Sequence, residues 1–550
     1  MENNIEDDAN LQQLYFKLSA NQPEEGWQAI RAMLDHAAGS RSAGLQELDS
    51  IRLRDPDWFQ SEQWVGMSLF ADRFAGSIQH LRDKLSYLLA LGINVVHILP
   101  VLIEASARPA DINGEEFKLN AGLGSLRDLR ELGEDLRSTD SLLMLDVPLV
   151  KSSGEEFLPV LLRHVLFLVN CGADILRIDI PAIFGNDAAA MPSIRIHLTL
   201  QFLQACLKRV APAACLAADG IGDPAEILEY FGSNKSAGKE CRMVYAGMQA
   251  ALQWDALATG DTRIMQNAQP LRLRKPEDCT WINFTRNHQA IAFTFDNAWI
   301  EQAGFEPTSH RQFLLDYYSG KYEGSPAKGV LVKNEDPNGG ERICGSLSSL
   351  CGLERAIKTP HITAMDESLA RITLMQAHTF LVGGIPMLYY GDEWATLNDY
   401  SYLDDPENLF DHLLMHRPNL VKIQKKGVKE KRAAEDVFEM TRKLIQLRKS
   451  LPVLRDDSNI YWVPEFNKHL AAFVRTGGES SLLVMLNYSV HTMEVPWMLV
   501  HEHIGSSLLY HEHFENKRWE MKGNEGWFQI GKYQVLVLEN IRQESAPGQE

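Results

Sequence analysis

The sequence predicts a (β/α)8 barrel that follows a helical region and precedes a small antiparallel β-domain. Two observations support this prediction: the middle of the chain holds eight short apolar runs rich in Val, Ile and Leu, and most are followed by a longer amphipathic stretch. Continuous apolar strands alternating with helices are typical of a parallel sheet covered on both faces, and eight such units close a barrel. The runs are residues 65–71, 93–99, 142–150, 174–180, 214–221, 243–246, 280–285 and 385–390. A doubly wound open sheet is the alternative, but no Gly-x-Gly-x-x-Gly motif follows an early strand.

The two flanks of the predicted barrel have different patterns. Residues 1–62 are expected to form helices, because Leu11, Leu14 and Leu18 recur at helical spacing. Residues 319–345 are rich in Gly, Lys and Pro and are expected to be a long loop over the barrel. Four apolar runs separated by turn residues predict C-terminal strands at 460–463, 470–475, 482–487 and 533–538. The chain therefore divides into a helical region (1–62), a barrel (63–455), a β-domain (456–543) and a tail (544–550).

Composition limits the partners of this chain. Its 550 residues have a formal charge of -19, which argues against nucleic acid and anionic membranes, because phosphates require clustered Lys and Arg. The acidic N-terminus lacks the apolar core of a signal peptide, and the longest apolar stretch, 158–169, is interrupted by Arg163 and His164. Seven scattered cysteines without a Cys-x-x-Cys motif suit reduced thiols. We therefore expect a cytoplasmic protein without a nucleic-acid or membrane partner.

The most informative segment is residues 173–182, where an apolar run contains Arg177 and, two residues later, Asp179. In a strand these two side chains share a face, so a carboxylate would lie beside a cation at a strand end. Other predicted strands end in similar residues: Asp72, Asp146, Asp219, Arg286 with His288, and Asp392 with Glu393. Such a set suits glycoside chemistry, in which one carboxylate attacks the anomeric carbon and another carboxyl protonates the leaving oxygen. For any single member, a salt bridge or strand-end cap is the simpler interpretation.

Longer stretches of the chain show a family resemblance. They are residues 54–59 (Arg-Asp-Pro-Asp-Trp-Phe), 71–76 (Ala-Asp-Arg-Phe-Ala-Gly), 173–179, 223–232, 281–295, 384–393 (Gly-Ile-Pro-Met-Leu-Tyr-Tyr-Gly-Asp-Glu), 397–402 and 416–418 (His-Arg-Pro). In order and spacing they resemble the amylosucrase group of glycoside hydrolase family 13, the α-amylase superfamily. The resemblance runs from about residue 50 to the C-terminus. It implies the barrel fold and a retaining mechanism.

The resemblance implies a role for each of five positions. Asp179 would be the nucleophile, and Arg177 would hold it ionised. His288 resembles the histidine that binds the sugar in the first subsite. Asp72 and Arg417 match an acid–base pair that closes the pocket floor in amylosucrases.

Two positions depart from the family pattern in ways that affect the chemistry. The acid/base glutamate falls on Asp219, which keeps the carboxyl group but is one methylene shorter. A misplacement of about 1 Å can cost on the order of a hundredfold in rate, and losing acid–base assistance outright costs roughly 10²–10⁴. The transition-state aspartate falls on Gln289, whose neutral amide offers no negative charge to a developing oxocarbenium ion.

Other differences surround the expected pocket. A second family aspartate falls on Ala290, an Asn-His pair falls on Val150 and Lys151, and the tyrosine that stacks under the sugar falls near Asp111. Residues 151–173 are enough for one helix and its loops, so the inserted domain that walls the family's pocket is expected to be absent. Without that wall the pocket would be wetter, which weakens the electrostatic contacts inside it.

Three functions follow from these observations. The first is a catalytically impaired relative of amylosucrase, or pseudoenzyme, that retains sugar binding or regulates an active partner. The second is an active glucosyltransferase or α-glucosidase that uses Asp179 with Asp219, or with Asp223 or Glu226 as replacement acid. The third is a scaffold that works through protein contacts. The combined losses favour the first, with sucrose, a maltooligosaccharide or another α-glucan as partner, and the oligomeric state stays open.

The C-terminal region contains two similar histidine clusters, His501-Glu-His503 and His511-Glu-His513. In strands each histidine pair would share a face, and four imidazoles could bind zinc or nickel. Exposed, solvated strand ends are the simpler interpretation, and no His-Glu-x-x-His motif and no EF-hand or Walker spacing occurs. We therefore expect no metal and no cofactor.

Overall fold

The computed structural model describes most of the chain. It covers residues 2–19, 23–102, 117–120, 122–150, 154–184, 193–220, 222–333, 340–359, 362–422, 427–456, 459–478, 480–507, 509–520 and 526–540. Asp111 and Lys151, on which two family positions were expected, lie outside these residues.

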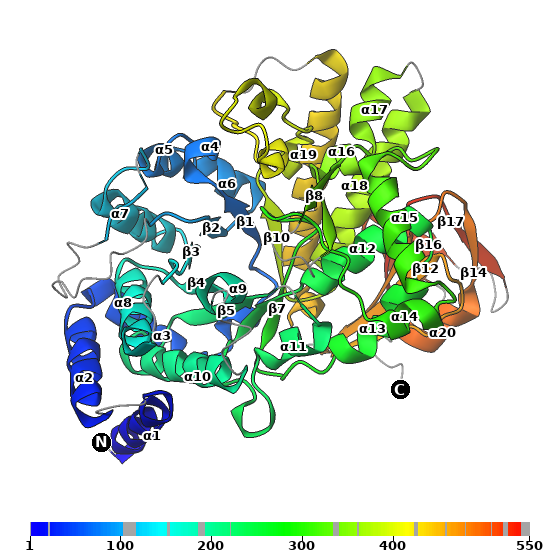
Figure 1. Cartoon of the computed structure of the whole chain (residues 1–550). Helices are drawn as coiled ribbons and strands as arrows, with labels where there is room; N and C mark the ends of the chain where they lie inside the picture. Colours follow the sequence, from blue (N-terminus) through cyan, green and yellow to red (C-terminus); the bar gives the residue numbers. More distant parts are fainter. Residues whose placement is uncertain are drawn as a thin grey trace, which may run out of the picture.

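A closed barrel of eight parallel strands forms the centre of the molecule (Figure 1). Neighbouring strands follow chain order, and the last strand closes the barrel by pairing with the first and the seventh. The strands are β1 (Gly66–Leu69), β2 (Val95–Ile98), β3 (Leu142–Asp146), β4 (Ile175–Asp179), β5 (Cys215–Asp219), β6 (Met243–Tyr245), β7 (Thr280–Asn283) and β10 (Ile385–Tyr389). Each lies within one of the eight apolar runs, so the predicted (β/α)8 barrel is confirmed.

Helices surround the barrel between its strands. Up to the fifth strand they are α4 (Ala71–Phe74), α5 (Ile78–Asp83), α6 (Leu85–Leu91), α7 (Leu126–Arg137), α8 (Phe157–Asn170), α9 (Ile180–Phe184) and α10 (Ser193–Val210). Beyond it they are α11 (Pro224–Glu229), α12 (Gly247–Thr259), α13 (Arg263–Arg272), α14 (Asn297–Gln302), α15 (Pro307–Ser319), α16 (Leu347–Leu350), α17 (Leu353–Lys358), α18 (Ile362–Leu381) and α19 (Val428–Ser450). Short 3₁₀ turns occur at Trp58–Gln60, Gly154–Glu156, Asn234–Ser236, Asp392–Trp394, Ser401–Asp404, His412–His416 and Pro452–Leu454. None of the described helices is long and apolar enough to cross a membrane.

Local sequence signals set the ends of these elements. The strands are apolar and buried because helices cover the barrel outside while side chains fill its interior, and all of β3 is buried. α7 begins at a capping box in which Ser125 accepts from the amide of Asp128 and the Asp128 carboxylate accepts from the amide of Ser125. α6 ends at Gly92, whose φ of 100° favours glycine. These turns bring the carboxyl ends of all eight strands to one face of the barrel.

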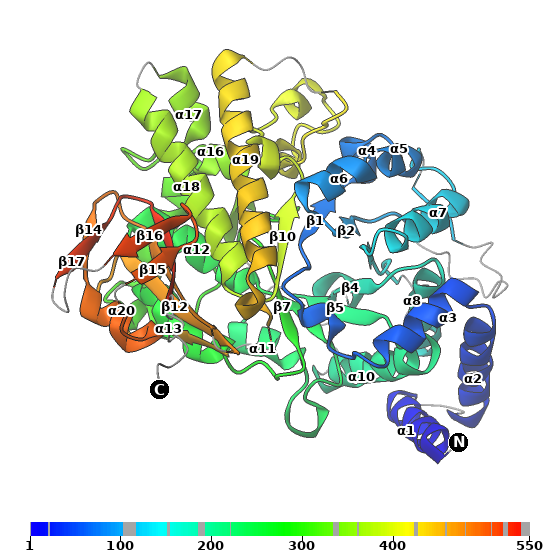
Figure 2. The ribbon, with the colours of Figure 1, turned by 180° about the vertical axis from the view of Figure 1, so that it is seen from behind.

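Three N-terminal helices pack on one side of the barrel, away from the C-terminal domain (Figure 2): α1 (Glu2–Leu18), α2 (Pro23–Gly39) and α3 (Ala43–Arg52). α1 and α2 contact α10, and α2 also contacts α8. Arg52 at the end of α3 forms an ion pair at 2.8 Å with Asp174, the residue before β4. The predicted helical region is therefore confirmed, and it braces the strand that holds Arg177 and Asp179.

The described residues of the C-terminal region form two antiparallel sheets. The larger has the strand order β11 (Asn459–Trp462), β12 (Leu470–Gly477), β13 (Ser480–Asn487), β18 (Val535–Asn540), β15 (Leu509–Glu512) and β16 (Lys517–Glu520). The smaller pairs β14 (Met493–Pro496) with β17 (Trp527–Ile530). The predicted C-terminal antiparallel β-domain is confirmed.

The first histidine cluster lies in a helix, so its predicted strand is wrong. α20 (Trp497–Ile504) forms because Trp497, Val500 and Ile504 recur at helical spacing and are buried. His501 and His503 therefore do not share a strand face. Within the described part of the chain, no three His, Cys, Asp or Glu residues are placed to hold a metal ion.

The stretch 319–345 also differs from its prediction as one long loop. β8 (Val330–Lys333) and β9 (Glu341–Cys344) form an antiparallel pair within it. Ile343 of this pair forms a bridge with Ile291, which follows the seventh barrel strand. The pairing therefore supports the segment after β7, which lies beside the candidate site.

Candidate functional site

Four charged side chains lie at the carboxyl ends of three neighbouring strands. Asp146 ends β3, Arg177 and Asp179 lie in β4, and Asp219 ends β5. In the strand register Asp146 lies opposite Arg177, and Asp179 lies opposite Asp219. Because these strand ends open on one mouth of the barrel, the fold gathers all four residues there. All four are among the strand-end residues that the sequence predicts, and the family resemblance gives a role to Arg177, Asp179 and Asp219.

Arg177 is the centre of this group. Its guanidinium donates from Nε and Nη2 to Oδ2 of Asp219, at 3.0 and 2.6 Å. Nη2 also lies 3.1 Å from Oδ2 of Asp179, and Nη1 lies 3.2 Å from Oδ1 of Asp146. Arg177 is only 2% exposed, so these contacts form in a region of low dielectric where they are strong. One buried cation thus serves three carboxylates.

A second set of contacts holds Asp146 from another direction. Nε2 of His97 lies 2.8 Å from Oδ1 of Asp146, and Nδ1 of the same ring lies 2.8 Å from Ser68 Oγ and 3.3 Å from the Tyr245 hydroxyl. Burial alone would raise the pKa of Asp146, but the charge of Arg177 and the His97 contact hold that pKa well below its ordinary value. Sequence reasoning missed His97 and Tyr245, whose only signal was a single polar residue within an apolar run.

Asp219 is nearly enclosed, with 6% of the residue exposed. Burial raises the pKa of its carboxyl above the ordinary value, Arg177 opposes this shift, and Asp179 adds to it. The carboxyl of Asp219 therefore contacts a cation. Even so, it is protonated more readily than a carboxyl in water, because burial raises its pKa.

Asp179 is the more open of the two carboxyls, with 24% of its side chain exposed compared with 7% for Asp219. Its Oδ1 accepts a hydrogen bond at 3.1 Å from the amide of Ala182. Oδ2 of Asp179 and Oδ2 of Asp219 both contact Nη2 of Arg177, at 3.1 and 2.6 Å. The distance between these two oxygens therefore cannot exceed the sum of the two contacts. This limit is close to the ~5–5.5 Å between the carboxyls of a retaining glycosidase.

The segment after β7 brings two further predicted residues to the same place. Nε2 of Gln289 lies 3.5 Å from Oδ2 of Asp179, near the outer limit of a hydrogen bond. The half-buried ring of His288 meets Phe70 edge-on. Burial and the positive charge of Arg177 lower the pKa of His288 well below its ordinary value, so its imidazole is neutral near pH 7.

Arg417 and Asp72, the expected pair at the pocket floor, form no ion pair in the described structure. Arg417 donates from Nε and Nη2 to the backbone carbonyl of His288, at 3.1 and 2.8 Å, and its guanidinium lies 5.3 Å from the centre of the Phe70 ring. Asp72 is exposed in the first turn of α4. Arg417 therefore positions the backbone of His288, and Asp72 lies apart from these contacts.

The remaining strand-end candidates form internal contacts. Arg286 donates from Nε and Nη2 to Oδ1 of Asp392, at 3.0 and 2.7 Å. Glu393 accepts from the Tyr87 hydroxyl at 3.0 Å and from the amide of Gly391 at 2.7 Å. Burial raises the pKa of Glu393 to about 7. For these residues the simpler structural interpretation fits the geometry.

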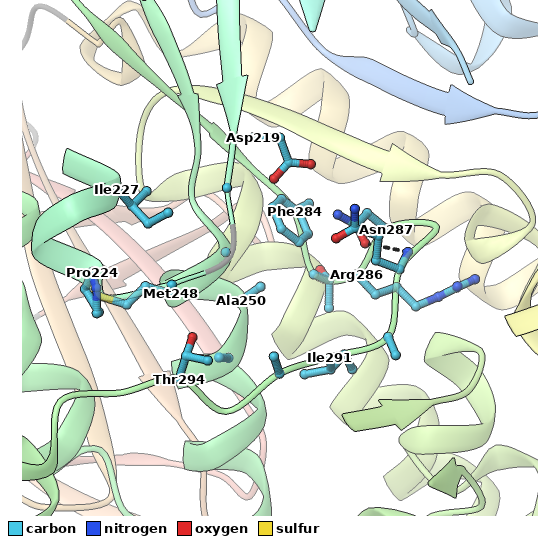
Figure 3. A pocket seen from close by; sticks show the side chains of 18 residues that line it. Asp219, Pro224, Ile227, Met248, Ala250, Phe284, Arg286, Asn287, Ile291 and Thr294 are labelled. Carbon is cyan, nitrogen blue, oxygen red and sulfur yellow. Dashed lines mark hydrogen bonds between the residues drawn. The ribbon is translucent and has the colours of Figure 1, made fainter. Parts of the chain in front are cut away.

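A cavity opens beside Asp219, between α11, α12 and the segment that follows β7 (Figure 3). Asp219 and Gln289 belong to its wall, so the cavity begins at the charged group described above. Its other polar lining residues are Thr285, Arg286, Asn287 and Thr294. The rest of the wall is apolar or lacks a side chain: Gly220, Gly222, Pro224, Ile227, Gly247, Met248, Ala250, Ala251, Phe284, Ala290, Ile291 and Ala292.

The chain matches no model of a known protein family. Solved structures, however, share its architecture over almost their whole length. The α-amylase from Geobacillus thermoleovorans complexed with acarbose has a TM-score of 0.57 and 13% identity, covering 88% of this chain and 99% of that one. AmyP in complex with maltose has a TM-score of 0.59 and 12% identity, covering 89% and 98%. The cyclic α-maltosyl-(1→6)-maltose hydrolase from Arthrobacter globiformis, in complex with cyclic α-maltosyl-(1→6)-maltose, has a TM-score of 0.55 and 14% identity, covering 88% and 99%.

This chain has the fold of the α-amylase-type glycoside hydrolases. Within this α-amylase-type barrel, the described residues between β3 and β4 form only a 3₁₀ turn and α8. Leu161, Leu162 and Val165 of α8 are fully buried, so this helix covers the barrel directly. The described residues between β3 and β4 therefore form one long helix, as the length of this segment predicts. Because a fold hosts many activities, function here has to be argued from the side chains of the site.

Proposed function

We propose that this chain is an α-amylase-type sugar-binding protein with degenerate catalytic motifs, which holds a sugar at the mouth of its barrel and turns it over weakly or not at all. The observation that supports this most is the pair of hydrogen bonds from Arg177 to Oδ2 of Asp219, at 2.6 and 3.0 Å. In a retaining site the second carboxyl has to reach the leaving oxygen and give it a proton. The carboxyl that we assign to that position is bonded to the arginine beside the nucleophile.

The length of the side chain accounts for this arrangement. An aspartate ends close to its strand, so the carboxyl of Asp219 stays within reach of Arg177, whereas a glutamate would extend one methylene farther. Burial raises the pKa of Asp219, which by itself favours proton donation. An acid must nevertheless lie within hydrogen-bond reach of the atom that it protonates. We therefore regard Asp219 as a partner of Arg177 that positions Asp179.

Gln289 stands where the family has the aspartate that stabilises the transition state. Its amide lies 3.5 Å from Oδ2 of Asp179. An amide has no net charge, so it stabilises a developing oxocarbenium ion less than a carboxylate would. An N–H group at this distance also interacts with the oxygen that would attack the sugar. The next family aspartate is Ala290, which lines the cavity without a polar group.

The groups that stay in place support sugar binding. Asp179 is partly exposed, and the neutral ring of His288 can donate and accept hydrogen bonds at the same mouth. Structures with a similar fold are complexed with acarbose and with maltose, and the sequence resemblance to amylosucrases adds sucrose. We propose an α-glucoside as the ligand, with its glucosyl group at this mouth. The seven buried, free cysteines support our proposal of a cytoplasmic location.

An active glucosyltransferase or α-glucosidase is the second candidate. It is favoured by the short separation of the Asp179 and Asp219 oxygens and by the raised pKa of Asp219. Asp223 and Glu226, the alternative acids, do not support it. Asp223 caps α11 by accepting from the amide of Ala225 at 2.7 Å, and neither Asp223 nor Glu226 lines the cavity beside Asp219.

Turnover separates these two candidates. The protein is incubated with sucrose and, separately, with maltooligosaccharides, and released glucose, fructose and polymer are measured beside the Asp179→Ala variant. We expect the native rate to be at or close to that of the variant, whereas turnover well above background that disappears in Asp179→Ala would establish an active enzyme.

Calorimetry with the same sugars then tests binding. We expect saturable binding that is weakened in His288→Ala and kept in Asp72→Ala, the matched control at an exposed position. If none of the sugars binds, the result would instead favour a scaffold that works through protein contacts.

A further inference from the structure

One part of the wall of the cavity beside Asp219 is apolar. Ile227 of α11, Met248 of α12, and Phe284 and Ile291 around the end of β7 present hydrocarbon and aromatic surface to it (Figure 3). Ile227, Met248 and Ile291 are only half-buried by the chain itself, so part of their apolar surface remains available. Concave sites with mostly apolar walls and a few polar groups are typical of ligand pockets. An apolar group that enters this cavity leaves water for a matching surface.

A glycine at the start of α12 leaves space in the cavity. Gly220, Gly222 and Gly247 all belong to its wall. Among the described residues, a β-carbon on Gly247, the first residue of α12, would meet only the ring of Phe284, at 4.0 Å. The space in front of Gly247 is therefore free to receive part of a ligand.

The polar residues of the wall are mostly engaged with other parts of the chain. The Thr285 hydroxyl lies 3.0 Å from that of Thr379, and Nη2 of Arg286 donates to Asp392 at 2.7 Å. A second sugar ring in the cavity would need a partner for each buried hydroxyl, since a hydroxyl without one is unfavourable. Among the described groups of the wall, Nη1 of Arg286 is buried without a hydrogen-bond partner and could serve one hydroxyl, whereas an aryl or alkyl group needs no partner.

The position of the cavity indicates which part of a ligand it receives. Asp219 occupies the position of the family's acid, which would lie beside the leaving oxygen, and Asp219 is also part of the cavity wall. A sugar bound at Asp179 would therefore direct its anomeric substituent into the cavity. We infer that the ligand is an α-glycoside whose anomeric substituent is an apolar aryl or alkyl group. The inference rests on the proposed function and specifies its ligand.

Two glycosides that differ only in this substituent test the inference. Binding of methyl α-D-glucopyranoside and of phenyl α-D-glucopyranoside to the native protein is measured by calorimetry. Burial of the phenyl ring predicts an affinity at least about tenfold higher for the phenyl glycoside. Equal affinities would overturn the inference.

Cavity variants show whether the preference arises at this place. Gly247→Leu fills the space in front of α12 and is expected to bring the ratio of the two affinities to about one. Met248→Gln, which keeps the side-chain length but adds a polar group, is expected to lower the same ratio. Gly44→Leu is the matched control, because Gly44 is an exposed helical glycine with open space around its β-carbon position. A preference that persists in both cavity variants would contradict the inference.

A last measurement distinguishes failure of this inference from failure of the proposed function. If neither glycoside binds, the proposed sugar site has failed, and the cavity is then probed with phenol alone. Binding of phenol that is lost in Gly247→Leu supports an apolar-group pocket. Absence of phenol binding overturns it.

Discussion

Arg177 and Asp219 are joined by two hydrogen bonds that end on one carboxylate oxygen, at 2.6 and 3.0 Å. Their strands are neighbours, and Asp219 lies beside Asp179 in the strand register, so the same guanidinium contacts both carboxylates. A cation that is needed beside the nucleophile thereby also fixes the second carboxyl. This shared contact is the reason why we regard the site as suited to holding a sugar more than to cleaving it.

Replacing Arg177 should lower stability strongly. Arg177→Met leaves the three carboxylates that the guanidinium contacts without a cation in a buried region, and losing one partner of a buried ion pair costs about 3–5 kcal/mol. Urea unfolding measures the change. Arg127→Met is the control, because the Arg127 side chain is 86% exposed and pairs with Glu131 on the surface of α7, so we expect nearly unchanged stability there. Equal stability of the two variants would contradict the buried contacts.

Glu393 should make stability depend on pH. Burial raises its pKa to about 7, so the folded chain binds this proton more tightly than the unfolded chain does. The stability that Glu393 contributes is therefore fully present below the unfolded pKa of 4.5 and is lost as pH rises through the folded pKa. Glu393→Gln resembles the protonated form and does not titrate. Its free energy of unfolding should gain about 2–3 kcal/mol relative to the native protein between about pH 5 and pH 8. A difference that stays constant over this range would contradict the shifted pKa.

The cysteines should resist thiol reagents while the chain is folded. All seven are buried and free, and burial raises the pKa of Cys171 and of Cys215 to about 11, so reactive thiolate is scarce. Titration with a chromogenic disulfide is expected to label none of them quickly in buffer and all seven in urea. Fast labelling of any thiol in the native protein would show that its surroundings are more open than the structure has them.

The barrel could be predicted because its strands are buried on both faces and read as unbroken apolar runs. The residues of the site could be predicted in part for the same reason. Once β4 and β5 are placed, Asp179 and Asp219 have to lie side by side at the same mouth, whatever their side chains contact. The prediction for His501 and His503 is wrong because two histidines two residues apart fit a strand, while the buried residues that decide the helix, Trp497, Val500 and Ile504, lie on either side of the pair.

The contacts of the site could not be predicted in the same way. Arg417 was expected to pair with Asp72, but its partner is the backbone carbonyl of His288, an acceptor that every residue has and that leaves no trace in the sequence. His97 is equally hard to recognise, because a single polar residue in an apolar strand has many structural explanations. The choice of Arg177 as the partner of Asp219 depends on side-chain length and orientation, which only the folded arrangement determines.

The rate of sugar release from a maltooligosaccharide is the most direct test of the central claim that the acid position is tied to Arg177. It is measured for the native protein, for Asp219→Glu/Gln289→Asp, and for the same double variant with Asp179→Ala added. We predict that the native rate is at background and that the double variant is at least about a hundredfold faster, since acid–base assistance contributes roughly 10²–10⁴. This gain should disappear when Asp179 is removed. A native rate well above background that Asp179→Ala abolishes would contradict the claim.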